Sequence, residues 1–511
     1  MGAADVEPDS PGNLRAPPIA NRSAGRFYFQ GALLLICVGT AFHLAYSTHL
    51  ELVGDEAYYW LWSRHHDICY LDKGPMIAWL IGAGTALFGQ TVFGVRFFAV
   101  LFASGTGIGM FVLARQLFSD RVAFWAVAMA TAVPLFAVGA SLMTIDTIYV
   151  FYWTWAAVAF WKAKEETRLR WWVITGALLG LGLLSKYTAA IELISFAAFC
   201  LWHAPSRLHL RRLTFWAMIG TALLFLIPAI VWNFQHRWPT SDWLLHRGSL
   251  DTGVGFHPSF VLLFLGEQAG VVSPLIFLGL ILVLLRPSLL CTPRVATGYA
   301  VLLFIPLFGL YLVFSFHYLG SPDWTAAAYI GGLVFLAAKW TDLGSTHRWA
   351  LWTAVGAFAL ASAETAILME TRWLHLPHRL DPLDRTRGSR SLAATVSKWE
   401  QRTGASFVIA DNYMTASLLS FYLPGHPETF VPATTRPLNQ LELWPTYAEK
   451  HPSGDALIVA KRAALVHSLH ISFVRIEPLG TVDVLDAGRT IGRYYLFVGR
   501  RGGVVLTHFV H

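Results

Sequence analysis

The feature that most constrains this chain is a series of apolar segments, each about as long as a membrane-spanning helix. A helix that crosses the hydrocarbon of a bilayer needs about 20 consecutive, mostly apolar residues. Such segments predict a polytopic α-helical membrane protein with about eleven transmembrane helices. They lie near residues 27–47, 94–117, 122–142, 145–161, 171–185, 188–203, 213–233, 259–285, 297–316, 324–340 and 348–370.

Composition and charge support this prediction. Hydrophobic residues make up 55% of the chain and charged residues 14%, whereas an average soluble protein has about 25% charged residues. With the N-terminus in the cytoplasm, the inner segments carry sixteen Lys and Arg residues and the outer loops carry six, as the positive-inside rule requires. The net charge of +7 therefore follows from topology in the inner (plasma) membrane, and no nucleic-acid partner is needed to explain it.

The remaining segments predict the domain organisation. Residues 1–26 are polar and Pro-rich, which predicts a disordered cytoplasmic tail. Residues 27–370 form the transmembrane domain, and its first outer loop, 48–93, contains a short apolar stretch at 74–89 that we expect along the membrane interface. Residues 371–511 are polar and turn-rich, and predict a small extracytoplasmic α/β domain. Its strands are expected at Phe407–Ala410, Leu457–Ala460 and Tyr494–Val498, and a helix at Met414–Tyr422.

Ionisable residues gather in the first outer loop, next to the membrane surface. Asp55 and Glu56 precede an aromatic helical pattern, and the run Tyr70–Pro75 brings a lysine into the same loop. Asp146 begins the fourth predicted span on the same side. Polar groups beside hydrocarbon are costly unless they are paired or functional. A carboxylate suits a general base for a hydroxyl, and a lysine suits a departing phosphate. This combination favours chemistry on a lipid-linked phosphate.

Five motifs follow one another along the chain, namely Asp55–Tyr59, Tyr70–Pro75, Leu183–Thr188, Ser321–Tyr329 and Phe421–Gly425. Their order resembles the GT-C superfamily of membrane glycosyltransferases, and most closely the bacterial relatives of protein O-mannosyltransferases and of the lipid A aminoarabinose transferase. The resemblance implies inverting transfer of a sugar from a polyprenyl-phosphate donor to a cell-envelope acceptor (lipid, glycan or protein) on the extracytoplasmic face, with residues 27–370 as the catalytic domain. The sequence departs from the pattern at Gly74, Asp323 and Thr325.

The resemblance also implies roles for individual residues. Asp55 matches the catalytic carboxylate, Lys73 the phosphate-binding lysine and Asp146 the second acidic position, which would position the acceptor or the sugar. Further outer-side residues complete the candidate site: Glu56 as a second catalytic carboxylate, Lys186, Arg237 and His317 as ligands of the donor phosphate, and Tyr58, Tyr59 and Asp323 as residues that position the acceptor or the sugar.

Several alternatives stay open at this point. Glu56 is also consistent with capping the helix that follows it, and Asp72 with pairing to Lys73. No metal is required, because protein cations can stabilise a leaving phosphate, although Asp55, Glu56 and Asp146 offer ligands for Mg²⁺ or Mn²⁺. Among functions, an oligosaccharide ligase or oligosaccharyltransferase is the nearest alternative. A lipid-linked sugar transporter is the alternative from another class, and would need ionisable groups near the bilayer midplane.

Overall fold

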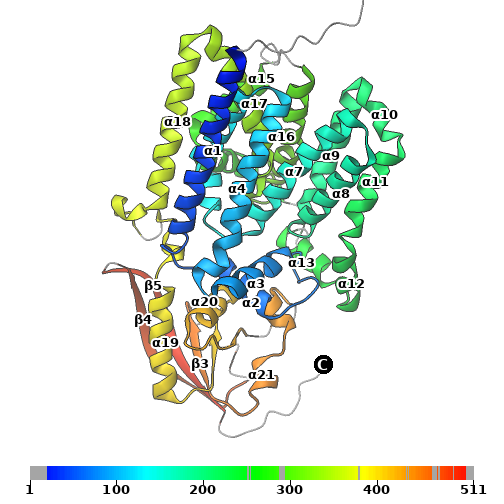
Figure 1. Cartoon of the computed structure of the whole chain (residues 1–511). Coiled ribbons are helices and arrows are strands. Elements are labelled where there is room, and N and C mark those ends of the chain that lie inside the picture. The colour runs from blue at the N-terminus through cyan, green and yellow to red at the C-terminus, as the bar shows by residue number, and fades with distance from the viewer. Residues whose placement is uncertain are drawn as a thin grey trace, which may run out of the picture.

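A bundle of apolar helices and a smaller α/β region on one side of it make up the chain (Figure 1). The computed structural model describes residues 20–501, except for 250–252, 254, 287–293, 378–379, 433, 435–436, 463–468, 470–471 and 487. Most of the predicted tail therefore lies outside the described residues. Helix α1 begins at Ala20, ahead of the predicted boundary at residue 27.

The number of membrane spans remains a prediction. Within the described residues, four helices are long and apolar enough to cross a membrane, or up to seven if each of three bent helix pairs is one span. The other predicted spans fall on α7, α8, α17 and the pair α5–α6, which do not meet these criteria of length and hydropathy. The helices of the bundle are α1 (Ala20–Tyr46), α4 (Val92–Leu117), α5 (Asp120–Ala132), α6 (Pro134–Gly139), α7 (Ile145–Glu166), α8 (Leu169–Leu183), α9 (Ala190–Trp202), α10 (Arg207–Leu210), α11 (Leu213–Leu224), α12 (Ile227–Gln235), α13 (Pro239–Arg247), α14 (Pro258–Val272), α15 (Pro274–Leu285), α16 (Arg294–Phe314), α17 (Ala328–Thr346) and α18 (Arg348–Met369).

Two short helices lie between the bundle and the sheet (Figure 1). They are α2 (Gly54–Arg64) and α3 (Met76–Phe88), both from the first predicted outer loop. Helix α3 has 13 residues, about 20 Å at 1.5 Å per residue, which is too short for a hydrocarbon core of about 30 Å. The expectation that the stretch 74–89 does not span the membrane therefore agrees with its length.

The C-terminal segment, residues 371–501, contains a five-stranded sheet in the order β2-β1-β3-β5-β4. β1 is parallel to β2 and β3, whereas β5 is antiparallel to β3 and β4. The three predicted strands and the predicted helix are confirmed. The elements are α19 (Ser389–Thr403), β1 (Phe407–Ala410), α20 (Tyr413–Tyr422), β2 (Thr429–Phe430), α21 (Tyr447–Lys450), β3 (Ala456–Ala460), β4 (Arg475–Asp486) and β5 (Arg489–Arg500).

The C-terminal segment shares a hydrophobic core with the first loop. Buried residues of α2, including Trp60, belong to the same cluster as Phe421 of α20 and residues of β1, β3 and β5. The Trp60 and Phe421 rings meet edge to face with centroids 4.9 Å apart. Gly54 allows this approach, because a Cβ at that position would lie 2.5 Å from Cβ of Met414. The shared core joins two regions that are far apart in the sequence.

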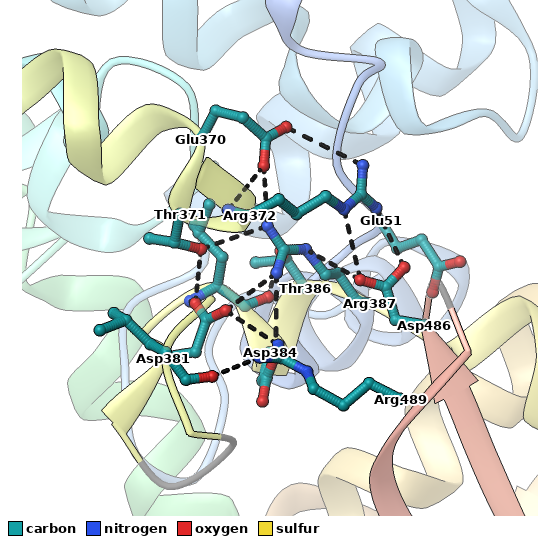
Figure 2. Close-up of polar contacts among 12 residues, drawn as sticks. Glu51, Glu370, Thr371, Arg372, Asp381, Asp384, Thr386, Arg387, Asp486 and Arg489 are labelled. Carbon is teal, nitrogen blue, oxygen red and sulfur yellow. Dashed lines mark hydrogen bonds and ion pairs between the residues drawn. The ribbon is translucent and has the colours of Figure 1, made fainter. Parts of the chain in front are cut away.

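A buried ion network fixes the C-terminal segment to the end of α18 (Figure 2). The guanidinium of Arg387, with 3% of the side chain exposed, bonds to Asp381 at 3.1 Å and to Glu370 at 3.2 Å. Arg489 of β5 adds a second cation, 3.3 Å from Asp381. The carboxylate of Glu51, in the loop before α2, accepts the Ser389 backbone N–H at 2.6 Å. These contacts hold α19 and the sheet against the bundle.

Acid should loosen this network. Burial alone would raise the pKa of Asp381, but hydrogen bonds from Thr371 and Leu383 and the charge of Arg387 outweigh it and hold this pKa below 3.8. Burial would also raise the pKa of Glu370, but hydrogen bonds from His49 and the Arg372 backbone, and the charges of Arg372 and Arg387, hold this pKa below 4.5. A depressed carboxyl pKa stabilises the fold above the unfolded-state value and loses that contribution as pH falls through the folded-state value.

We therefore expect the unfolding temperature to fall as pH drops below about 4.5, the ordinary Glu value. This acid-dependent fall should be smaller in Arg387→Met, because that variant lacks the cation that lowers both pKa values. Thermal unfolding of the purified wild-type and Arg387→Met proteins between pH 7 and pH 3 measures this fall. Identical pH dependence in the two proteins would contradict the assignment.

Candidate active site

Asp55 lies in the first turn of α2, on the side that faces the C-terminal segment. Its carboxylate is half-buried and accepts a hydrogen bond from the hydroxyl of Tyr413 at 3.3 Å. An acidic residue is favourable in this first turn because the helix N-terminus carries partial positive charge. The placement leaves the Asp55 carboxylate reachable, as a general base must be.

Glu56, the next residue, is fully buried and points elsewhere. Its carboxylate receives Nε and Nη2 of Arg96 at 2.8 and 2.6 Å. It also accepts the backbone N–H groups of Met143 at 2.8 Å and Val53 at 3.0 Å, and the second of these caps the start of α2. Four hydrogen bonds thus occupy the two oxygens. We assign Glu56 to anchoring the loop in place of the catalytic role expected from the sequence.

Lys73 belongs to the same outer loop, and its ammonium lies 2.9 Å from Oδ2 of Asp72. The ammonium also faces the ring of Tyr59 at 5.4 Å and that of Trp243, on α13, at 5.8 Å. Burial lowers the pKa of Lys73, but the Asp72 and Asp55 carboxylates raise it more, so the net direction is upward. Lys73 is therefore a charged cation at neutral pH. It is paired with Asp72, which is one of the alternatives that the sequence left open.

Gly74 is explained by the close approach of this loop to the end of α8. A Cβ at this position would lie 2.0 Å from the backbone oxygen of Leu184, and the N–H of Met76 donates to that same oxygen at 3.3 Å. No side chain fits there. Local packing thus explains why glycine stands at position 74, where the sequence departs from the superfamily pattern.

Gly74→Ala should displace the loop that carries Lys73. Overpacking of this kind costs about 1–3 kcal/mol, so we expect a lower unfolding temperature. Gly82→Ala in α3 is the matched control, because its Cβ would meet neighbouring side chains at 3.5 Å, an ordinary contact distance. Thermal unfolding of both variants tests the point. Equal stability of Gly74→Ala and wild type would show that the loop can shift to accommodate a Cβ, and would contradict the prediction.

A second polar cluster is formed by residues from three separate segments. Asp146 lies in the first turn of α7, and Nζ of Lys186, just after α8, bonds to its Oδ1 at 2.6 Å. Asp323, before α17, lies within hydrogen-bonding reach of Asp146. Three predicted site residues thus meet. Lys186 is engaged by a carboxylate, and its ammonium also faces the rings of Tyr149 and Trp324 at 5.7 and 5.9 Å.

Tyr58 and Tyr59 of α2 are the two tyrosines of the predicted site. Tyr59 is 4% exposed, and burial, followed by the Asp55 and Asp72 carboxylates, raises its pKa well above 10. Asp146 contributes to the same upward direction, so Tyr59 sits within electrostatic reach of both clusters. Tyr58 instead accepts the backbone N–H of Gln440 at 2.6 Å, which ties α2 to the C-terminal segment.

Among the described residues, two predicted phosphate ligands, Arg237 and His317, form no hydrogen bond or ion pair with these clusters. Arg237 is exposed in the turn between α12 and α13, with a left-handed φ of 62°. The His317 ring bonds to backbone: Nδ1 accepts the N–H of Gly255 at 2.9 Å, and Nε2 meets the carbonyl oxygen of Gly248 at 2.9 Å. It therefore holds the chain after α13. Arg247, at the end of that helix, lies close enough to affect the pKa of Tyr413.

The carboxylates that we considered for a divalent cation are not assembled into one site. Glu56 is bonded to Arg96 and Asp146 to Lys186. Over the described part of the chain, no group of three or more His, Cys, Asp and Glu side chains is arranged to hold a metal ion. A reaction without a required metal remains a proposal.

Two residues near Asp55 were missed by the sequence argument. Arg96 was counted only as an outer-loop cation, yet it is 1% exposed, and a buried Arg needs an acidic partner. The arginine inside an otherwise apolar run was the available signal. Tyr413 comes 358 residues after Asp55, and nothing in its local sequence indicates that it reaches the first loop.

Comparisons with known proteins agree with this architecture. Residues 72–232 match the family described as dolichyl-phosphate-mannose-protein mannosyltransferase. Lipid A galacturonosyltransferase RgtD of Rhizobium johnstonii is 26% identical over 231 residues, 44% of this chain and 48% of that protein. Undecaprenyl phosphate-alpha-4-amino-4-deoxy-L-arabinose arabinosyl transferase of Pseudomonas savastanoi pv. phaseolicola is 29% identical over 178 residues, 31% of this chain and 33% of that protein. The chain thus aligns with about half or less of each relative.

The fold is similar over nearly the whole chain to a solved structure. ArnT from Cupriavidus metallidurans superposes with a TM-score of 0.58 in the apo state, at 16% identity, and the match covers 94% of this chain and 98% of that one. The same protein bound to undecaprenyl phosphate gives a TM-score of 0.56 at 17% identity, over 91% and 97%. Through these partial matches the chain is related to the GT-C membrane glycosyltransferases, among them the protein O-mannosyltransferases, and it shares the fold of ArnT.

Proposed function

We propose that this protein transfers a single sugar from a polyprenyl-phosphate donor to a cell-envelope acceptor at the extracytoplasmic face of the inner membrane. The observation that carries the proposal is the juxtaposition of a reachable carboxylate, Asp55, with a charged lysine, Lys73, beside a bundle of apolar helices. The names of the relatives support it, since one uses an undecaprenyl-phosphate sugar and another modifies lipid A. A lipid is therefore the first acceptor to test.

The transfer would proceed in one inverting displacement. The oxygen of an acceptor hydroxyl attacks the anomeric carbon of the sugar, and the bond from that carbon to the phosphate oxygen breaks. Asp55 takes the hydroxyl proton as general base. The polyprenyl phosphate leaves with the bonding electrons, and Lys73 neutralises its negative charge. Lys73 either gives up its present bond to Asp72 to do so, or keeps that bond and contacts the phosphate as well.

The second cluster suits the positioning of sugar or acceptor. Asp146 and Asp323 offer hydrogen-bond acceptors to hydroxyl groups, and Lys186 holds Asp146 in place at 2.6 Å. Tyr59 lies within electrostatic reach of both Asp146 and Asp55. Aromatic rings with polar tips are well suited to sugar contacts, because each presents an apolar face and a hydroxyl. The two clusters would then face opposite ends of one transferred sugar.

The proposal is tested by transfer in reconstituted vesicles. Purified protein is given undecaprenyl-phosphate-linked sugars, each radiolabelled, with lipid A, envelope glycan or envelope protein as the acceptor. We expect label to move to one acceptor class, and none to move from nucleotide sugars. Transfer of whole oligosaccharides would favour the ligase alternative. Movement of labelled donor across the vesicle membrane with no covalent product would favour the transporter and overturn the proposal.

A further inference from the structure

One side chain of the C-terminal segment touches the proposed base. The Tyr413 hydroxyl donates to Oδ1 of Asp55 at 3.3 Å, and over the described residues no other hydrogen bond reaches this carboxylate. The bond is longer than the usual 2.7–2.8 Å for O–H···O, as catalytic hydrogen bonds often are before substrate binds. The contact therefore links α20 directly to the group that would remove the acceptor proton.

Tyr413 is held firmly enough to act as a fixed donor. It is the first residue of α20, and the preceding Asn412 caps the helix by accepting the N–H of Thr415 at 3.0 Å. Its ring packs on that of Tyr58, with centroids 4.6 Å apart. Burial, and then the Asp55 carboxylate, raise the pKa of Tyr413, so its hydroxyl keeps the proton that it donates.

The neighbouring cation cannot orient Asp55 in the same way. Lys73 influences both Asp55 and Tyr413 electrostatically, but its ammonium bonds to Asp72 at 2.9 Å. Arg247 and Tyr59 also lie within electrostatic reach of this pair, without a hydrogen bond to Asp55. The direction of the Asp55 carboxylate is thus set by Tyr413.

We propose that Tyr413 is a positioning residue: by binding Oδ1 of Asp55 it directs Oδ2 towards the acceptor hydroxyl. A carboxylate in the first turn of a helix can rotate about its side-chain bonds unless a donor holds it. A base that is misplaced by even 1 Å loses much of its rate advantage. The inference rests on the proposed function, and it gives the C-terminal segment a part in the reaction.

Tyr413→Phe tests the proposal in the transfer assay. We expect kcat to fall about tenfold, the effect of losing roughly one hydrogen bond to a charged group, and KM for the donor to stay within about twofold. Tyr422→Phe is the matched control, because Tyr422 belongs to the same helix and accepts the N–H of Leu52 at 2.8 Å. That variant should keep the wild-type kcat. Unchanged kcat in Tyr413→Phe, or equal losses in both variants, would overturn the proposal.

A second measurement does not depend on transfer. Thermal unfolding is compared for Tyr413→Phe, for Asp55→Ala, which removes the acceptor that an Asn would keep, and for the double variant. If the two groups are bonded, their effects on stability should not add, whereas independent groups give additive effects. Additive effects would overturn the proposed contact. If the wild-type protein transfers no sugar, the proposed function fails. The comparison of the single and double variants still decides, independently of transfer, whether Tyr413 and Asp55 are coupled.

Discussion

Asp55→Asn should abolish most of the transfer while leaving the protein folded. General-base catalysis contributes about 10²–10⁴-fold to such reactions, and an amide cannot take up the acceptor proton. We therefore expect kcat to fall at least about 100-fold. Asn keeps the shape of the side chain and can still accept the Tyr413 hydroxyl, which bonds Asp55 at 3.3 Å in the wild type. Initial rates in the reconstituted transfer assay measure the effect.

Two controls make this result interpretable. The unfolding temperature of Asp55→Asn should stay close to that of wild type, because the carboxylate is half-buried and makes one hydrogen bond within the described residues. Binding of undecaprenyl phosphate should also persist, since the phosphate is assigned to Lys73. Transfer at the wild-type rate in this variant would keep the enzyme and remove Asp55 as its base.

Glu56→Ala should have the largest effect on stability. It would leave the Arg96 guanidinium, 1% exposed, without a counter-charge. Breaking a buried ion pair by removing one partner costs about 3–5 kcal/mol. The variant also loses the acceptor for two backbone N–H groups, those of Val53 and Met143. We expect poor yield and a clearly lower unfolding temperature.

The neighbouring variants separate anchoring from chemistry. Arg96→Met should be similarly unstable, because Arg96 also donates to the backbone oxygens of Ser47, Leu50 and Glu51. Glu165→Ala, which removes an exposed acid at the end of α7, should unfold at the wild-type temperature. If Glu56→Ala keeps its stability and loses transfer, Glu56 is a catalytic residue and the anchoring assignment is wrong.

Local patterns predicted the elements of this fold well, and distant contacts poorly. Hydrophobic periodicity and turn residues located β1, β3 and α20 within one residue of their observed bounds. This works because each of these elements is specified mainly by its own local sequence. Apolar length does not reveal where a helix breaks. The apolar stretch at 259–285 was counted as one span, yet it forms α14 and α15 at an angle of 116°, since Pro274 cannot continue the first helix.

For the same reason, motif order predicted only part of the arrangement of the candidate residues. Adjacent acids such as Asp55 and Glu56 have the same local sequence signal, and only tertiary structure shows that one is reachable and the other is bonded to Arg96. Asp146, Lys186 and Asp323 were identified from motif order alone and do meet. His317 had the right chemistry for phosphate, but its ring nitrogens bond to backbone groups.

The shared core between α2 and the C-terminal sheet has a consequence for biosynthesis. Asp55 leaves the ribosome 358 residues before Tyr413, which at about 5–20 residues per second is a delay of roughly 20–70 s. During that interval the first loop is complete, but Trp60 and its neighbours lack the C-terminal residues that cover them. A chain that stops after α18 would therefore keep every predicted span and still expose an unfinished apolar surface, of the kind that quality-control proteases recognise.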